Sequence, residues 1–188
     1  MPVRTEHEQE VNSIYFVTFT CYNWLPLFQL TNSYDLVYKW FDYLHTQNIR
    51  VAGYVIMPNH LHVLLYFSEM PKTLNAVIGN GKRFIAYEII NRLIAANDES
   101  MLAKLSAGVK DRERKKGQIH KVFKESFDAK KCTSTVFIYQ KLDYIHNNPT
   151  SGKWMLAKDF IGYEHSSASF YEEGKSGYCK LMRIEDVM

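Results

Sequence analysis

The sequence has few cysteines and no long apolar run, and both absences narrow the class of protein. Its three cysteines, Cys21, Cys132 and Cys179, lie far apart and form no CxxC motif, which argues against a disulfide framework and a thiolate zinc site. The longest apolar stretch, residues 85–96, is interrupted by charged and polar side chains, so no membrane span is expected. The polar N-terminus lacks the apolar segment of a signal peptide. We therefore expect a protein of the reducing cytoplasm.

Net charge is also small, at +3, but it is unevenly distributed. Residues 104–131 contain ten Lys or Arg and four Asp or Glu, a local charge of 10 − 4 = +6, so the rest of the chain carries −3. A basic block on a nearly neutral chain fits a surface that binds a polyanion. It is equally consistent with a solvated charged loop.

The length and the apolar content suit one hydrophobic core. The chain has 188 residues, of which 46% are hydrophobic, and a folded chain of this size buries roughly 70% of its unfolded surface. Aromatic residues make up 14%, which suits a sheet core and base stacking alike. We expect a single domain over residues 1–188.

The pattern of apolar residues predicts an α+β fold. Strands are predicted where aromatic and β-branched residues cluster, at 14–22, 51–57, 60–67 and 119–127. Helices are predicted where apolar residues recur at helical spacing, at 33–47, 73–96 and 133–147. Residues 97–117 are expected to form a mobile loop with a helical fragment, and residues from 150 an irregular tail with one short helix. The first six elements match the ferredoxin-like βαββαβ antiparallel sheet, and the seventh is an added C-terminal helix.

Residues 57–65, with the sequence MPNHLHVLL, bring two histidines together. Side chains alternate along a strand, so His60 and His62 share one face of the sheet. Two adjacent imidazoles can bind a divalent cation, but a metal site needs at least one more ligand from elsewhere in the chain. Two histidines on a half-exposed sheet are the simpler alternative.

Residues 141–149, with the sequence KLDYIHNNP, bring together a tyrosine, an amide and a lysine. On a helix, Tyr144 and Asn148 are four residues apart and share a face, and Lys141 lies on that face too. A nearby ammonium favours a phenolate, so Lys141 is a candidate to help Tyr144 lose its proton. A packing tyrosine at an ordinary helix end is the simpler alternative.

Together the two segments resemble the single-tyrosine transposases of the HUH superfamily. MPNHLHVLL resembles their HUH motif, in which U is a bulky apolar residue, here Leu61, and DYIHNNP resembles their tyrosine-bearing helix. The closest resemblance is to the REP-associated tyrosine transposases. The N-terminal YFVTFTCYN and the later YEHSSASFY, with Tyr163, Ser166 and Ser167, are also similar to that group. The resemblance covers roughly residues 12–171.

The resemblance implies a metal-dependent DNA transposase. His60 and His62 correspond to metal ligands, Tyr144 to the nucleophile, and Asn148 to a polar third ligand. The implied metal is Mg²⁺ or Mn²⁺. The implied substrate is single-stranded DNA with an imperfect (REP-like) hairpin, cut without ATP through a 5′-phosphotyrosine and transferred during DNA transposition. Relatives exist both as homodimers and as monomers.

DNA contacts are expected at basic and aromatic positions. Lys82 and Arg83, on the second long helix, match basic positions that contact the DNA backbone in the family, and Lys141 is a further candidate. The basic residues 110–131 are expected to follow a phosphate path. Aromatic side chains near the first strand are candidates for stacking on unpaired bases, namely Tyr15 and Tyr22.

Three alternatives remain at this point. The first is a non-catalytic protein that binds DNA hairpins on the same fold, although such a protein would not need His60, His62 and Tyr144 together. The second is a relaxase or replication initiator with the same chemistry, but such proteins are usually longer and carry a further domain. The third is a metal-independent RNA-binding module, for which Tyr144 would be dispensable.

Overall fold

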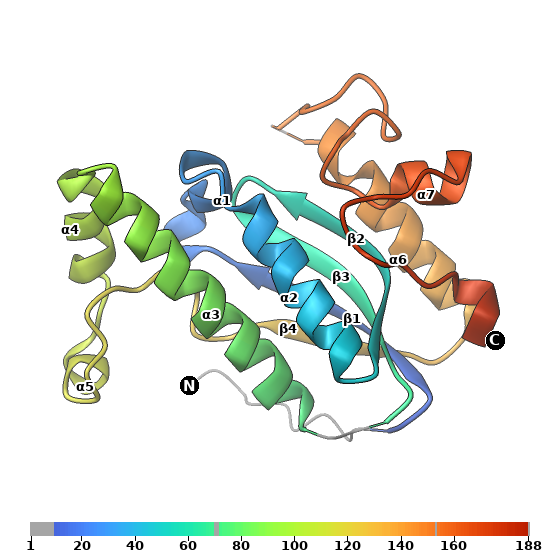
Figure 1. Ribbon diagram of the computed structural model, residues 1–188, viewed down its shortest axis with the longest axis horizontal. Coiled ribbons are helices and arrows are strands. Elements are labelled where there is room, and N and C mark those ends of the chain that lie inside the picture. Colours follow the sequence, from blue (N-terminus) through green and yellow to red (C-terminus); the bar gives the residue numbers. More distant parts are fainter. Residues whose placement is uncertain (1–9, 70–71, 153, 188) are drawn as a thin grey trace.

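A four-stranded antiparallel sheet forms the centre of the computed structural model, which describes residues 10–69, 72–152 and 154–187 (Figure 1). Its strands lie in the order β2-β3-β1-β4, and each neighbouring pair is antiparallel. Their bounds are Ser13–Thr20 for β1, Ile49–Met57 for β2, His60–Phe67 for β3 and Asp128–Cys132 for β4. The fold is α+β, as the sequence predicts.

Helices cover both faces of this sheet. They are α1 (Leu27–Leu30), α2 (Tyr34–Thr46), α3 (Leu74–Ala95), α4 (Glu99–Ala107), α5 (Asp111–Arg114), α6 (Thr135–Asn147) and α7 (Ala168–Glu173). Short 3-10 turns are η1 (Tyr22–Trp24), η2 (Asn148–Thr150) and η3 (Ile184–Val187). In Figure 1, α2 and α3 lie in front of the sheet and α6 lies on its other side. None of the helices in the described part of the chain is long and apolar enough to cross a bilayer.

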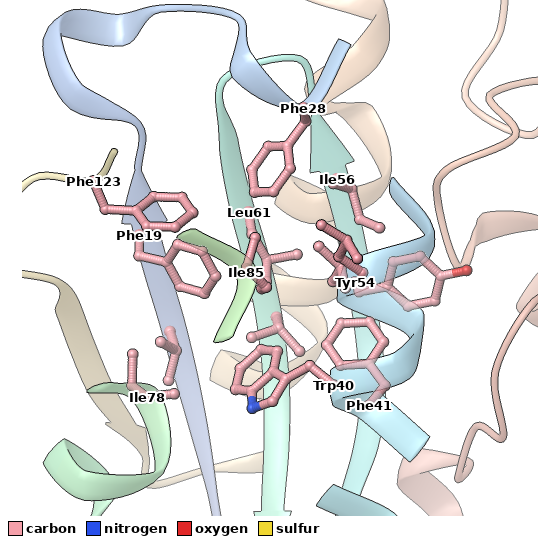
Figure 2. Packing of buried hydrophobic residues seen from close by; sticks show 14 of the residues in the cluster. Phe19, Phe28, Trp40, Phe41, Tyr54, Ile56, Leu61, Ile78, Ile85 and Phe123 are labelled. Atoms are coloured by element: carbon pink, nitrogen blue, oxygen red, sulfur yellow. The ribbon is translucent and has the colours of Figure 1, made fainter. Parts of the chain in front are cut away.

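The face beneath α2 and α3 carries the main hydrophobic core. Alternate residues of the two central strands point into it, including Val17, Phe19 and Leu61, and all three are almost fully buried. Figure 2 shows Trp40 and Phe41 reaching toward the sheet and the rings of Phe19 and Phe123 beside each other. The apolar stripes of the two helices therefore close this face.

The other face packs against α6. A second core cluster joins Phe16 and Leu64 of the sheet to Leu142 and Ile145 of the helix. Gly53 of β2 allows this close approach, because a Cβ there would lie 2.6 Å from Cδ1 of Leu142. Helix α6 and its side chains are thus held directly on the sheet.

The C-terminal segment is fastened to β2 more firmly than an irregular tail would be. Backbone hydrogen bonds of 2.9 Å join Ile56 to His165 and Ser167 to Tyr54. The Tyr171 hydroxyl donates to the carbonyl of Ala52 at 2.6 Å. The edge of β2 therefore has partners supplied by residues more than 100 positions later.

Two of the predicted elements are wrong. The fourth strand lies at Asp128–Cys132, and residues 119–127 contain only an isolated bridge between Phe123 and Cys21. Val122 and Phe123 are both buried, so this segment does not alternate between two faces as a strand does. Residues 97–117 contain α4 and α5, because the Asp98 side chain caps α4 by accepting from the Met101 backbone N–H at 3.0 Å. The other three strands and three long helices agree with the predicted elements to within a few residues at each end.

Candidate active site

His60 and His62 lie side by side at the start of β3, on the face that α6 partly covers. Their ring centroids are 4.7 Å apart. Thr20 and Thr18 stand opposite them on β1. Both imidazoles are largely buried, with 7% and 5% of their surface exposed. The HxH pattern therefore gives a pair of converging rings, as the alternation of the strand predicts.

Hydrogen bonds orient both imidazoles. The Asn59 Oδ1 lies 2.6 Å from Nδ1 of His60, and the Asn59 amide nitrogen donates to the Trp24 carbonyl at 3.0 Å. Since an amide oxygen only accepts, His60 Nδ1 carries the proton and Nε2 keeps its lone pair. His62 Nδ1 lies 2.6 Å from the Thr18 hydroxyl. This is the arrangement in which outer groups orient histidines that bind a cation.

Burial keeps both histidines neutral at physiological pH. It lowers the pKa of His60 to about 4, although the hydrogen bond between His60 and the Asn148 side chain acts in the opposite direction. Burial also lowers the pKa of His62 to about 3, and the nearby His60 and Lys141 lower it further. Neutral imidazole is the form that binds metal ions.

Helix α6 brings Tyr144 and Asn148 to the histidine pair. The Tyr144 ring lies 5.1 Å from the His62 ring and 6.0 Å from the Phe16 ring, and 49% of its surface is exposed. Asn148 keeps a helical backbone, with φ −57° and ψ −42°, and its side chain hydrogen-bonds to His60. The two sequence segments thus meet in one place.

Lys141 lies beside this cluster. Its ammonium is 4.8 Å from the centre of the Phe16 ring and 5.7 Å from the centre of the Tyr144 ring. Lys141, Phe16 and Tyr144 line an open cleft of about 930 Å³, together with His62. The cleft is also lined by residues of β1, of η1 and of the segment before and within β4, namely Thr18, Thr20, Trp24, Lys124, Ser126, Phe127, Asp128, Ala129 and Lys130.

The donor set fits a divalent cation with open positions. Among the described residues no three His, Cys, Asp or Glu side chains converge, so the candidate ligands are two neutral imidazoles and the Asn148 amide. Such a set carries no charge, and a cation bound there would still require anionic ligands such as substrate phosphates.

Lys82 and Arg83 do not join this cluster. The Lys82 ammonium donates to the carbonyls of Lys124, Glu125 and Ser126 at 2.7, 3.2 and 3.3 Å, and burial lowers its pKa to about 8. Arg83 is exposed on α3, where it lines a groove between α2 and α3 on the other side of the sheet. Their contact with DNA stays a prediction, but neither contacts the histidine pair.

The basic block is divided between structural and cleft positions. Lys121 forms a buried ion pair with Glu113 at 3.0 Å, and Lys131 pairs with Glu10 at 2.5 Å. Lys124 and Lys130 line the cleft. Only part of the block is therefore available to a polyanion at this site.

The two aromatic stacking candidates are not on the cleft surface. Tyr15 is completely buried in the main core, so its predicted stacking on bases is wrong. Tyr22 is half-buried against α4, where a Cβ on Gly108 would lie 2.5 Å from its ring. Besides Tyr144, an exposed aromatic residue at the site is Trp24, which sequence analysis missed because no periodicity marks the segment between β1 and α1.

His146 lies in the same segment as Tyr144 but has a structural position. It is buried, and its Nε2 lies 2.9 Å from the Ser167 hydroxyl. Ser167 also accepts from the Tyr54 backbone N–H at 2.9 Å. His146 therefore links α6 to the C-terminal segment and does not join the pair formed by His60 and His62.

Comparison with solved structures identifies the fold. No protein-family model and no curated protein matches the sequence. A solved REP-associated tyrosine transposase, bound to a REP hairpin, superimposes on 96% of this chain and 93% of its own, with a TM-score of 0.62 and 14% identity. The chain has the fold of a REP-associated tyrosine transposase. The resemblance found in the sequence thus extends to the fold.

A second solved structure is more distant. It is described as a candidate transposase from Deinococcus radiodurans, with 14% identity and a TM-score of 0.42 over 73% of this chain and 92% of that chain. The transposase fold assigned above rests on the first comparison alone. The chemistry is argued from the site.

Proposed function

We propose that the protein is a metal-dependent DNA transposase that nicks single-stranded hairpin DNA and transfers the strand. The observation that carries the proposal is the convergence of His60, His62, Asn148 and Tyr144 beside the cleft that His62 and Tyr144 line. These are the two halves of the sequence resemblance, and they are separated by more than 80 residues in the chain. A protein that only binds DNA has no need for this set.

In the proposed reaction, Tyr144 is the nucleophile. Its hydroxyl oxygen forms a bond to the scissile phosphorus, and the bond from phosphorus to the 3′ oxygen breaks. The 3′ oxygen leaves with a proton as a free hydroxyl, and the tyrosine becomes esterified to the 5′ phosphate. Attack by a 3′ hydroxyl on this ester reverses the step, so strand transfer needs no ATP.

The chain's other residues bind and orient. His60, His62 and Asn148 would hold a Mg²⁺ or Mn²⁺ ion, which when bound neutralises phosphate oxygens and helps align the attack. Asn59 and Thr18 fix the two imidazole rings through their hydrogen bonds of 2.6 Å.

Lys141 is placed to assist Tyr144. A free tyrosine has a pKa near 10, so attack at neutral pH requires help in removing the proton. The ammonium of Lys141 lies 5.7 Å from the Tyr144 ring centre, on the same side of α6. We infer that its charge stabilises the negative charge on the attacking oxygen in the transition state and attracts the DNA strand into the cleft.

The arrangement of the chain supports the rest of the assignment. The order β2-β3-β1-β4 suits a ferredoxin-like βαββαβ domain, to which α6 adds the tyrosine. Tyr144 lies beside His62 of its own chain, which favours attack within one subunit over exchange between the subunits of a dimer. We propose a single domain that acts on DNA in the cytoplasm.

The test is formation of a covalent protein–DNA adduct. Single-stranded hairpin DNA from the flanks of the gene is incubated with Mn²⁺ or EDTA and analysed on a denaturing gel. We expect an adduct that requires Mn²⁺ and is lost by more than about 10³-fold in Tyr144→Phe. Tyr139→Phe, on the same helix but hydrogen-bonded to Glu185, is the control and should retain the adduct.

The same assay separates the main alternative. Tight binding of the hairpin that ignores EDTA, without an adduct in the wild type, would support a non-catalytic binding protein instead. An adduct of full yield in Tyr144→Phe would exclude Tyr144 as the nucleophile.

A further inference from the structure

Trp24 is an exposed aromatic side chain at the end of the cleft. It lies in η1, and 53% of its surface is exposed. Its ring centroid is 5.9 Å from that of His60, with the planes at 79°. The Lys124 ammonium lies over the indole at 4.1 Å from its centre. A large apolar ring and a cation thus adjoin one of the proposed metal ligands.

The backbone at this position is held in an uncommon conformation. Trp24 has φ +57° and the preceding Asn23 has φ +50°. Asparagine tolerates this left-handed region, but a bulky residue there is strained, and such strain clusters at functional sites. Packing of the indole into the core does not compensate for this strain, because the side chain remains exposed.

Asn59 ties this strained turn to the site. Its buried side chain donates to the Trp24 carbonyl at 3.0 Å and accepts from His60 Nδ1 at 2.6 Å. The same amide therefore fixes both His60 and the turn that presents Trp24. On the other wall, Lys82 and the Thr20 carbonyl hold the backbone of Lys124, at 2.7 and 2.9 Å.

Ring contacts connect Tyr144 to Trp24 through the histidine pair, so the two residues flank the pair, one beside each histidine. Tyr144 contacts His62, His62 contacts His60, and His60 contacts Trp24, with ring centroids 5.1, 4.7 and 5.9 Å apart. In an in-line displacement at phosphorus, the attacking and leaving oxygens lie on opposite sides. With Tyr144 attacking from one side of the pair, the leaving 3′ oxygen faces the Trp24 side.

We propose that Trp24 and Lys124 form a subsite for one unpaired nucleotide, the one that provides the leaving 3′ oxygen. Its base stacks on the indole, and its phosphate pairs with the Lys124 ammonium. Stacking on an aromatic side chain accepts any base, so the subsite binds the nucleotide without selecting its identity. This inference rests on the proposed function, because it uses the direction of attack by Tyr144.

The subsite has a role after cleavage as well. The strand on the 3′ side of the break is held through its 5′ phosphate by the bond to Tyr144, whereas the strand that ends in the free 3′ hydroxyl has no covalent link. The stacked base and the paired phosphate keep that end in place for the reverse step. Loss of Trp24 should therefore reduce rejoining more than cleavage.

The test walks an abasic nucleotide through the DNA around the cleaved bond. With wild-type protein and Mn²⁺, removing the base on the 5′ side of that bond should slow adduct formation about tenfold to a hundredfold. Trp24→Ala should slow the intact substrate to the same extent, and combining the two changes should add little. Trp24→Phe, which keeps a ring, should retain most of the rate, and the ratio of rejoined to cleaved strand should fall in Trp24→Ala.

Tyr87→Ala is the matched control, because Tyr87 is 66% exposed on α3, which covers the other face of the sheet. It should leave all substrates unaffected. The proposal would be overturned if Trp24→Ala and the abasic site slowed adduct formation by independent factors that multiply. It would also be overturned if removing the base on the 3′ side of the bond, and not the base on its 5′ side, slowed the reaction.

Binding distinguishes this failure from failure of the proposed function. The same oligonucleotides are titrated, by fluorescence anisotropy, into Tyr144→Phe protein with and without Trp24→Ala. If the wild type forms no adduct, the proposed function fails. The subsite is then supported only if Trp24→Ala and the abasic site each weaken binding and their combination weakens it no further. It is excluded if the two changes weaken binding independently.

Discussion

The two faces of the sheet differ in how completely they are covered. Helices α2 and α3 bury one face under aromatic and aliphatic side chains, with Val17, Phe19 and Leu61 almost fully enclosed. On the other face α6 covers only part of the strands and leaves the cleft between Tyr144 and Trp24. The closed face stabilises the sheet, and the open face can therefore hold polar groups that do not contribute to a core.

The strongest test compares two buried histidines on the α6 side of the sheet, His62 at the cleft and His146 in the contact with the C-terminal segment. His62→Ala should abolish binding of one Mn²⁺ ion and reduce adduct formation by at least about 100-fold, the equivalent of the several kcal/mol that a catalytic cation supplies. His146→Gln should leave the Mn²⁺ stoichiometry unchanged and lower the free energy of unfolding by about 1–3 kcal/mol, because the buried hydrogen bond between His146 and Ser167 is lost. Titration calorimetry and urea unfolding measure the two effects. Loss of Mn²⁺ binding in His146→Gln would contradict this division.

Acid should destabilise the protein through the open face. Burial lowers the pKa of His60, His62 and His146 to about 4, 3 and 4, below the ordinary value of 6.5. Between these values the unfolded chain binds more protons than the folded chain, so the free energy of unfolding falls as pH falls from 6.5 to about 4. The slope should correspond to as many as three protons.

Urea unfolding at several pH values measures this slope. His146→Gln should remove one proton from it, and added Mn²⁺ should make it steeper because protons compete with the cation. A free energy of unfolding that does not change between pH 6.5 and pH 4.5 would show that these histidines are not neutralised by burial.

Two glycines of α3 test the closed face. A Cβ on Gly81 would lie 2.4–2.9 Å from the Trp40 ring, whereas one on Gly79 would meet nothing within 4 Å. Gly81→Ala should lower the free energy of unfolding by about 1–3 kcal/mol through overpacking. Gly79→Ala should raise it by about 0.5–1 kcal/mol through helix propensity. Thermal unfolding compares them, and equal effects would mean that Trp40 moves freely.

The smallest expected effect concerns Lys141. Lys141→Met should reduce adduct formation about tenfold, since the attacking oxygen and the DNA phosphates lose a neighbouring positive charge. Lys141→Arg should retain most of the activity. A rate of adduct formation at saturating DNA that is unchanged in Lys141→Met would remove the assisting role and leave Lys141 as a DNA contact.

The strong periodic signals in the sequence predicted most of the fold. The alternation in HLHVLLYF fixed the face of His60 and His62, and the i, i+4 spacing brought Tyr144 and Asn148 to the same side of α6. The prediction of a strand at 119–127 failed because Lys121 is buried by pairing with Glu113, eight residues earlier, an ion pair that the alternation of apolar residues does not encode. The starts of α4 and α5 depend on capping hydrogen bonds, from the Met101 N–H to Asp98 and from the Lys110 N–H to Glu113, which the periodicity of apolar residues does not show.

Some site residues had no sequence signal for the same reason. Asn59 reads as a turn residue, yet its amide joins Trp24 to His60. Lys82 reads as a surface cation, yet it holds three carbonyls of the segment that carries Lys124. Such roles depend on which strands become neighbours, and so they appear only in the folded structure.

The attachment of the C-terminal segment to β2 also bears on self-association. An exposed edge strand offers unpaired N–H and C=O groups to another chain. Here β2 is an edge of the sheet, and its Tyr54 and Ile56 groups are already bonded to Ser167, His165 and Tyr163. A second copy therefore cannot pair with β2 at these positions unless the C-terminal segment is first displaced. The segment thus protects this edge of the sheet from edge-to-edge aggregation.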